Sequence, residues 1–423
     1  MRASRILLWL VWCVAITAPL VWVRLDYDWE RDVWRATVRA DRWQLLVDEA
    51  PQWLGRHLGD LGLATVLIGA VIAVAWLWRR PAWVQVRSDL ERRTRGKYRD
   101  VLVAVVVMLV LVLACRHLGD MQLEWAIMAG MYVVLALGLN LIVGMTGLLV
   151  LGYAGFMAVG AYTFAVLHQH TGITWWAAML PAAAAGAVTG FLLGLPSLRL
   201  RGDYLAIVTL GFGETVRFLI KNLVGEQSII IRREARVPAL MWEHPVWRWL
   251  FPDGLSRLET ELWIVALMVA GSIWMMHNLT HSRIGRAWIA IREDETAAAA
   301  MGIPTVQLKL LAFVIGAVWA SVMGVFFVAH NTSANPEMFG FGESVLILSM
   351  VVLGGMGSGP GPIVGALVLY LVPEVLRERF PALISYRPML VGAVMVAMMV
   401  FRPQGLVGSL RRKIELTQEG TAR

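Results

Sequence analysis

The sequence predicts an all-α fold, a polytopic transmembrane helical bundle with about 10–12 spans and both termini in the cytoplasm. Hydrophobic residues make up 58% of its 423 residues and charged residues only 16%, whereas about 25% of a soluble protein is charged. Its 39 glycines and 20 tryptophans suit close helix packing and bilayer interfaces. Apolar windows of about 20 residues, long enough to cross a membrane, recur along the chain.

These apolar windows give the expected spans in chain order. They lie near residues 6–23, 61–78, 100–116, 124–144, 149–168, 175–196, 203–222, 262–279, 308–329, 343–357, 362–378 and 384–401. With about twelve crossings, four arginine-rich segments fall on one side of the membrane, which the positive-inside rule makes the cytoplasm. Those segments are 79–99, 199–203, 281–294 and 411–413. The span count near 343–401 stays open.

The chain divides into an accessory part, a core and a tail. Residues 1–100 are expected to hold accessory spans, the first of them retained because its apolar run ends without a clean cleavage site. Within this part, tryptophans among charges over 24–60 favour an interfacial amphipathic helix, and 79–99 form a basic cytoplasmic loop. Residues 101–410 form the transmembrane core, and residues 411–423 a cytoplasmic tail.

Composition and motifs give no reason to propose an enzyme. The formal net charge of +8 is what orienting loops require in a polytopic protein, so no nucleic-acid partner is expected. The chain has no phosphate-binding loop, no H-E-x-x-H and no G-x-S-x-G motif. Its two cysteines, Cys13 and Cys115, lie in apolar runs and suggest neither a metal site nor a disulfide. We therefore expect a transporter without a metal or cofactor.

Glycines interrupt the stretch LGLNLIVGMTGLLVLGYAGFMAVGAY at 137–162. A helix is broken inside lipid only where protein or a water-filled cavity satisfies the freed backbone groups. Two interpretations stay open, close helix packing through small residues and lining of a translocation pathway. The pathway candidates here are Asn140, Gly144, Gly147 and Gly152.

The segment RLRGDYLAIVTLGFGETVRFLIKN, which begins at 199, places charges in an apolar helix. Glu214, Arg217 and Lys221 share one helical face, and Glu214 lies about 16 Å from Asp203 at 1.5 Å per residue. A carboxylate at that depth needs a partner, and Arg217 can supply one. The pair either stabilises the helix or forms a polar face beside the path of a small zwitterion. The candidates on this helix are Thr209, Gly211, Gly213 and Glu214.

Six glycines and two prolines fall in VVLGGMGSGPGPIVGA, residues 351–366. Such a stretch cannot be a regular helix throughout, so we expect a turn or broken helix at the basic face. A structural turn is one interpretation. The other is a gate or hinge formed by Gly354, Gly355 and Gly357.

The stretch GRAWIAIREDETAAAAMGI, residues 285–303, predicts one charged helix between two spans, because strong helix formers fill it. It would present a small-residue face for another protein, while its charges stay free to set register with that partner. Gly302, in a left-handed conformation, and Pro304 would end it. The alternative is a solvated loop. The small-residue face consists of Ala287, Ala290, Ala297, Ala298 and Met301.

This stretch resembles the cytoplasmic coupling segment of ABC-transporter permeases. Together with the segments above, VVLGGMGS and FRPQGL (401–406), it resembles the LivM-type permeases of branched-chain amino-acid importers over about 125–410. The resemblance implies one half of a heterodimeric permease in a bacterial inner membrane. It implies as partners a second permease subunit, two cytoplasmic ATPase subunits and a periplasmic substrate-binding protein. The implied ATPase-coupling residues are Gly285, Arg286, Ala290, Glu293, Asp294, Glu295, Ala298 and Gly302.

One segment departs from the family pattern. Where the family carries Thr-Gly-Gly-x-x-Gly, this chain reads NLVGEQSIIIRREARVPAL over 222–240. The implied solutes are leucine, isoleucine and valine, with urea, amides or another small polar solute as the alternative. A secondary transporter is the alternative of a different class.

Overall fold

The computed structural model describes residues 23–28, 33–38, 119–197, 203–225, 229–231 and 256–379, together with 389, 392, 395–396 and 405–406. The chain forms two compact units, Met1–Ile72 and Ala73–Arg423. The expected spans near 6–23, 61–78 and 100–116 lie outside the described residues, and so does most of the one near 384–401.

The first unit contains a β-hairpin. Strands β1 (Val23–Asp28) and β2 (Val33–Val38) pair antiparallel, with Val23 opposite Val38. The interfacial helix expected over 24–60 is therefore wrong for this part of the segment. The sequence VRLDYD alternates in polarity, and VWRATV is rich in β-branched and aromatic residues, which favours strands over a helix.

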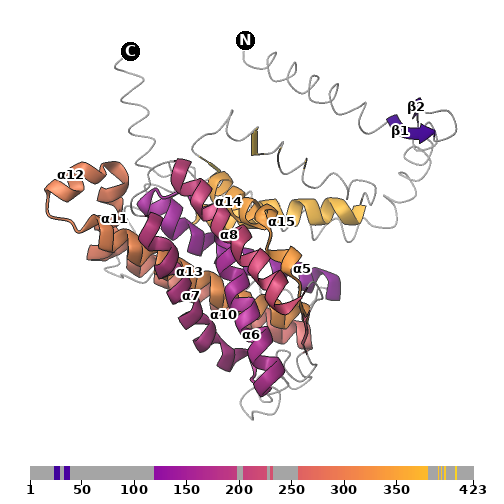
Figure 1. Ribbon diagram of the computed structural model, residues 1–423, viewed down its shortest axis with the longest axis horizontal. Coiled ribbons are helices and arrows are strands. Elements are labelled where there is room, and N and C mark those ends of the chain that lie inside the picture. The colour runs from indigo at the N-terminus through magenta and orange to yellow at the C-terminus, as the bar shows by residue number, and fades with distance from the viewer. Residues whose placement is uncertain are drawn as a thin grey trace, which may run out of the picture. The chain divides into compact units, whose positions relative to one another are not determined.

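The second unit is a helical bundle (Figure 1). The chain runs α5 (Asp120–Asn140), η2 (Leu141–Met145), α6 (Tyr153–Thr171), α7 (Trp175–Ser197), α8 (Asp203–Val224), α10 (Arg257–His281), α11 (Arg283–Glu293), α12 (Glu295–Ala300), α13 (Thr305–Asn331), α14 (Phe341–Gly354) and α15 (Gly361–Arg379). Between these helices lie the paired two-residue strands β3 (Ile229–Ile230) and β4 (Ser333–Ala334) and the 3₁₀ helix η5 (Pro336–Phe339).

The described helices agree with the predicted all-α membrane fold. Five are long and apolar enough to span a membrane, and each matches an expected span: Asp120–Met145, Trp175–Pro196, Arg257–His281, Thr305–Asn331 and Pro336–Gly354. Helices α6, α8 and α15 occupy three more expected spans. Helix α8 carries charged residues along its length, and the apolar part of α15 covers only Gly361–Val375.

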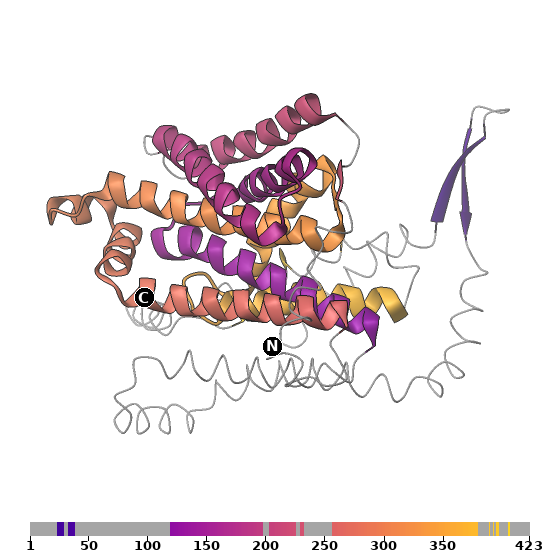
Figure 2. The ribbon, with the colours of Figure 1, turned by 90° about the horizontal axis from the view of Figure 1, so that it is seen from below.

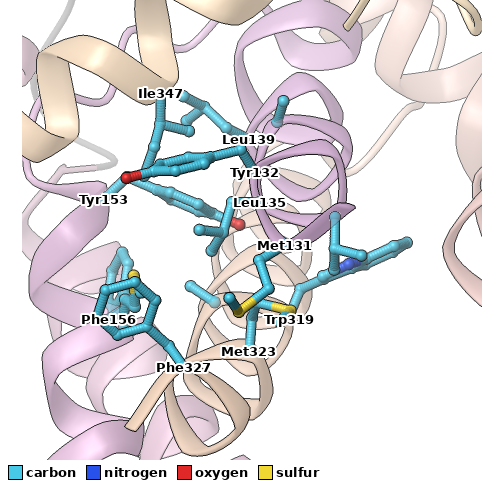
Figure 3. Packing of buried hydrophobic residues seen from close by; sticks show 14 of the residues in the cluster. Met131, Tyr132, Leu135, Leu139, Tyr153, Phe156, Trp319, Met323, Phe327 and Ile347 are labelled. Carbon is cyan, nitrogen blue, oxygen red and sulfur yellow. The ribbon is translucent and has the colours of Figure 1, made fainter. Parts of the chain in front are cut away.

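Helices α5 and α13 form the centre of the bundle. Of their most apolar windows, 83% and 72% of residues are buried, against 33% for α7 and for α10. Figure 3 shows the core between them, where Met131 of α5 lies near Met323 of α13. The Tyr153 hydroxyl of α6 donates to the Gly316 carbonyl oxygen of α13. Helices α11 and α12 project from one end of this unit (Figures 1 and 2).

Candidate functional site

Helix α11 is fixed firmly to the bundle. Ser282 caps its first turn by accepting a hydrogen bond from the Gly285 amide at 3.1 Å. A side chain at Gly285 would overlap the Leu279 carbonyl oxygen of α10, so only glycine allows this approach. The fully buried Trp288 donates its indole N–H to the Leu308 carbonyl oxygen of α13 at 2.8 Å. Helix α11 is therefore held by contacts with both α10 and α13.

The single helix expected over 285–303 is wrong, because the helix breaks at Asp294. This residue is extended, with φ −153° and ψ 111°. Its carboxylate accepts hydrogen bonds from the Thr296 and Ala297 amides at 2.8 and 3.0 Å. The alanine run favours a continuous helix, but an aspartate at an N-cap satisfies amides that would otherwise lack partners. The segment is two short helices with a corner between them.

The expected docking face changes accordingly. Ala298 is buried, so it packs against its own chain and is not free for a partner. Glu295 forms an ion pair with the buried Lys309, and Asp294 is a cap, so two of the three acidic residues are engaged within the chain. Gly302 has φ +81°, which confirms the predicted left-handed helix end. The small or apolar residues of this segment that are exposed are Ala297, Ala299, Ala300, Met301 and Gly302.

Arg292, in the last turn of α11, reaches into the bundle. Its Nη1 donates to the Gly144 carbonyl oxygen in η2. A side chain at Gly147, which has φ +74°, would lie 3.1 Å from Arg292 Cγ, and one at Gly357 would overlap Arg292 Nη1. The guanidinium group therefore rests on glycine backbone from two segments. We call Asn140, Gly144, Gly147, Arg292, Gly357 and Ser358 the Arg292 junction.

Asn140 completes the junction from α5. Its Oδ1 accepts from the Gly357 amide at 2.9 Å and its Nδ2 donates to the Ser358 carbonyl oxygen at 3.2 Å, while its side chain is fully buried. The turn that it holds lies between α14 and α15, with Gly355 at φ +115° and Gly357 at φ +77°. The predicted interruption of the helix at 351–366 is confirmed.

Gly405 and Leu406, the last two residues of the FRPQGL segment, pack on the same turn. The Leu406 amide donates to the Leu353 carbonyl oxygen at 2.8 Å. A side chain at Gly405 would lie 2.5 Å from the Gly355 Cα atom. Gly354 is equally confined, because a side chain there would overlap the Gly361 carbonyl oxygen. Backbones therefore meet directly around the candidate gate residues.

The other pathway candidates lie between α6 and α8. A side chain at Gly152 would overlap the Thr209 carbonyl oxygen, and one at Gly213 would lie 3.0 Å from the Gly152 Cα atom. The Thr209 hydroxyl accepts from the Leu151 amide at 3.0 Å. These contacts support the packing interpretation for Gly152, Thr209 and Gly213. Gly211 is exposed, with nothing within 4 Å of an added Cβ atom.

Glu214 joins a network of ion pairs. The predicted pair is present, with Arg217 Nε donating to Glu214 Oε2 at 2.9 Å. Arg217 Nη1 also donates to Glu337 of η5 at 2.6 Å, and Lys221 Nζ lies 3.5 Å from the same carboxylate. The other Glu214 oxygen accepts from the Phe341 amide at 3.0 Å. We call Glu214, Arg217, Lys221 and Glu337 the Glu214 cluster.

Sequence reasoning missed one residue of each site. Arg292 stands directly before the acidic residues of the segment 285–303, and Glu337 lies in η5, between α13 and α14. A single basic side chain in a basic segment gives no signal of its own. Among the candidate coupling residues, the exposed Arg286 only donates to the His281 carbonyl oxygen. No described residues form a group of three or more that could hold a metal ion.

Comparison with known proteins identifies the family. Residues 121–399 match the family described as the permease component of the branched-chain amino acid transport system. The chain belongs to this permease family. It is 40% identical over 321 residues to the high-affinity branched-chain amino acid transport system permease protein LivM of Salmonella typhimurium, covering 70% of this chain and 72% of that protein. The LivM protein of Escherichia coli is 39% identical over 329 residues, 74% of this permease and 76% of the relative.

A second kind of relative is also similar to this permease. The high-affinity branched-chain amino acid transport system permease protein LivH of Salmonella typhimurium is 31% identical over 158 residues, 37% of this chain and 50% of that protein. No solved structure matches. Like these relatives, this permease is a multi-pass membrane subunit and not itself an enzyme.

Proposed function

We propose that this permease imports branched-chain amino acids as one of two different permease subunits in an ATP-driven importer of a bacterial inner membrane. Two cytoplasmic ATPase subunits drive it, and a periplasmic binding protein delivers the solute. Family membership and the names of the LivM and LivH relatives support this function. The chain itself has no phosphate-binding loop, so its energy comes from separate subunits.

The ATPase docks on the corner formed by α11 and α12. Both helices project from one end of the bundle (Figure 2). Helix α12 exposes Ala297, Ala299 and Ala300 there. An exposed alanine surface permits close approach of a partner, and the exposed Glu293 beside it sets the pairing. Since Ala298 and Glu295 are engaged within the chain, they hold the corner in shape and do not contact the partner.

One observation carries the mechanism, namely that Arg292 connects the docking segment to both η2 and the glycine turn. When the ATPase subunits close, α11 moves and the Arg292 side chain moves with it. Because its guanidinium group rests on Gly144 and Gly357, the ends of α5 and α14 follow. We assign the gate to the turn at Gly354–Gly357, where left-handed glycines absorb the change in backbone angles.

Transport in a defined system tests the function. The permease is purified with the second permease and the ATPase subunits, reconstituted into liposomes, and supplied with binding protein and ATP. We expect uptake of labelled leucine, isoleucine and valine that requires ATP. Uptake of urea or amides alone would replace the solute assignment, and ion-driven uptake by the isolated chain would overturn the importer.

A bulky substitution tests the docking surface. Ala299→Trp adds a large side chain to an exposed position of α12, and Ala184→Trp makes the same change on the exposed side of α7. We expect Ala299→Trp to abolish co-purification of the ATPase and uptake, while Ala184→Trp keeps both. If ATPase binding survives in Ala299→Trp, the corner is not the docking site.

A further inference from the structure

The Glu214 cluster lies at a depth where lipid is expected. Glu214 accepts from the amide of Phe341, the first residue of α14. Helix α14 ends at Gly354, beside the Arg292 junction, after 14 residues. At 1.5 Å per residue this distance is about 20 Å, less than the hydrocarbon thickness of about 30 Å. Glu337 and Phe341 both belong to Pro336–Gly354, a segment long and apolar enough to span a membrane. The contacts of Arg217 with Glu337 and of Glu214 with Phe341 therefore hold the cluster against a segment of membrane-spanning character.

These four charged side chains are also partly exposed. The side chains of Glu214, Arg217 and Lys221 are 35%, 31% and 37% exposed, and that of Glu337 is 58% exposed. Ion pairs exposed to hydrocarbon are costly, and charged groups in membrane proteins face protein or water instead. The exposed side of α8 is therefore not a lipid surface.

Helix α7 shows what a lipid surface of this bundle looks like. It contains no charged residue between Trp175 and Ser197, and its exposed side chains are apolar. Among them are Leu180, Val188, Phe191 and Leu192. Helix α8 exposes apolar side chains as well, including Ile207 and Phe218, but it intersperses them with Gly211, Thr215 and the cluster. Small and hydroxyl residues on a membrane helix favour contact with another helix.

We propose that this exposed side of α8 is the surface on which the second permease subunit docks, with the Glu214 cluster facing a water-filled solute path between the two subunits. This inference rests on the proposed function. Depth excludes the other partners, because an ATPase or a binding protein remains outside the hydrocarbon. The cluster contains two acidic and two basic groups, so it repels neither end of an amino-acid zwitterion.

Photocrosslinking in membranes tests the docking surface with matched positions. p-Benzoylphenylalanine replaces Phe218 on α8 or Phe191 on α7, both exposed phenylalanines. The variants are expressed with the second permease, the ATPases and the binding protein. We expect Phe218 to give a covalent product with the second permease and Phe191 to give none. A product with lipid, or with another segment of this chain, at position 218 would overturn the proposal.

Thiol labelling tests the water-filled path. In a chain whose Cys13 and Cys115 are replaced, Thr215→Cys lies on α8 and Val188→Cys on α7. A water-soluble maleimide should label position 215 in assembled complexes and leave 188 unlabelled; equal labelling at the two positions would overturn the path.

Uptake and co-purification are measured on the same samples, so that a failure of the docking surface on α8 can be told from a failure of the proposed function. An intact, transporting pair without the crosslink from Phe218 would contradict the docking surface alone. Absence of both the pair and ATP-driven uptake in the unmodified complex would overturn the proposed function and this inference together.

Discussion

The Arg292 junction and the Glu214 cluster both hold charged side chains in an apolar bundle, but in opposite ways. At the junction one guanidinium group bonds to a backbone carbonyl oxygen and packs on glycines. In the cluster, side chains pair with side chains and stay 31–58% exposed. A side chain that bonds to backbone is held in place, because the backbone of a packed helix cannot rotate away. Two exposed side chains in an ion pair can instead change their conformations. The comparison teaches that the junction suits transmission of movement and the cluster suits an aqueous surface.

Glycine replacement in the turn should give the largest effect. Gly357→Ala places a Cβ atom against Arg292 and 2.9 Å from the Gly144 carbonyl oxygen, at φ +77°. The left-handed backbone alone costs about 1–2 kcal/mol, and displacement of the guanidinium adds to this. We expect a lower melting temperature of the complex and loss of uptake.

Gly359→Ala in the same turn is the matched control. Nothing lies within 4 Å of an added Cβ atom at this position. It should keep near-normal stability and uptake. If the two variants behave alike, the close fit of Arg292 on Gly357 does not constrain the turn.

Replacement of Arg292 should have the second-largest effect. Arg292→Ala deletes a charged hydrogen bond, a type worth about 1.5–3 kcal/mol, and leaves α11 in place through Trp288. We therefore expect ATPase binding to persist while solute transported per ATP hydrolysed falls sharply. Arg283→Ala removes an exposed arginine at the start of the same helix that is not among the candidate coupling residues, and it should retain coupling. Equal coupling ratios in the two variants would exclude Arg292 as the connection.

Asn140→Ala should have a smaller effect on the same turn. It removes the bonds to the Gly357 amide and the Ser358 carbonyl oxygen. Each such bond contributes about 1 kcal/mol net, and the buried partners are left unsatisfied. Asn331→Ala removes only a local bond to Phe327 within α13 and serves as control. Thermal unfolding of the two purified complexes measures the difference, and a smaller loss for Asn140→Ala would contradict the role of Asn140 in holding the turn.

The sequence predicted the features that depend on near neighbours. Apolar windows located the helices, and spacing of three residues gave the ion pair of Glu214 with Arg217. The composition of the glycine-rich stretch predicted a turn, and Gly302 ended a helix as expected. In each case a few adjacent residues determine the backbone.

The remaining contacts join residues far apart in the chain. Arg292 and Gly144 are 148 positions apart, and Asn140 and Ser358 are 218 apart. Such pairs depend on how helices pack, which no local pattern encodes. The break at Asp294 was missed for another reason, since helix propensity of the alanine run competes there with side-chain capping, and capping prevails.

The smallest expected effect tests the nature of the cluster itself. A double-mutant cycle with Glu214→Gln and Arg217→Gln measures the coupling energy between these side chains from the thermal stability of the complex. If water faces the cluster, we expect less than about 1 kcal/mol, the range of exposed ion pairs. Salt should lower the value further, because ions screen accessible charges.

A buried pair supplies the reference for this measurement. The side chains of Glu261 of α10 and His330 of α13 are 0% and 4% exposed, and the His330 ring nitrogen Nδ1 contacts Glu261 Oε2. Removal of one partner from a buried pair costs about 3–5 kcal/mol. The cycle on Glu261 and His330 should therefore give the larger coupling energy. If the coupling energy of Glu214 with Arg217 is as large and does not change with salt, no water faces the cluster in the assembled transporter. Helix α8 would then contact the second subunit without water between them.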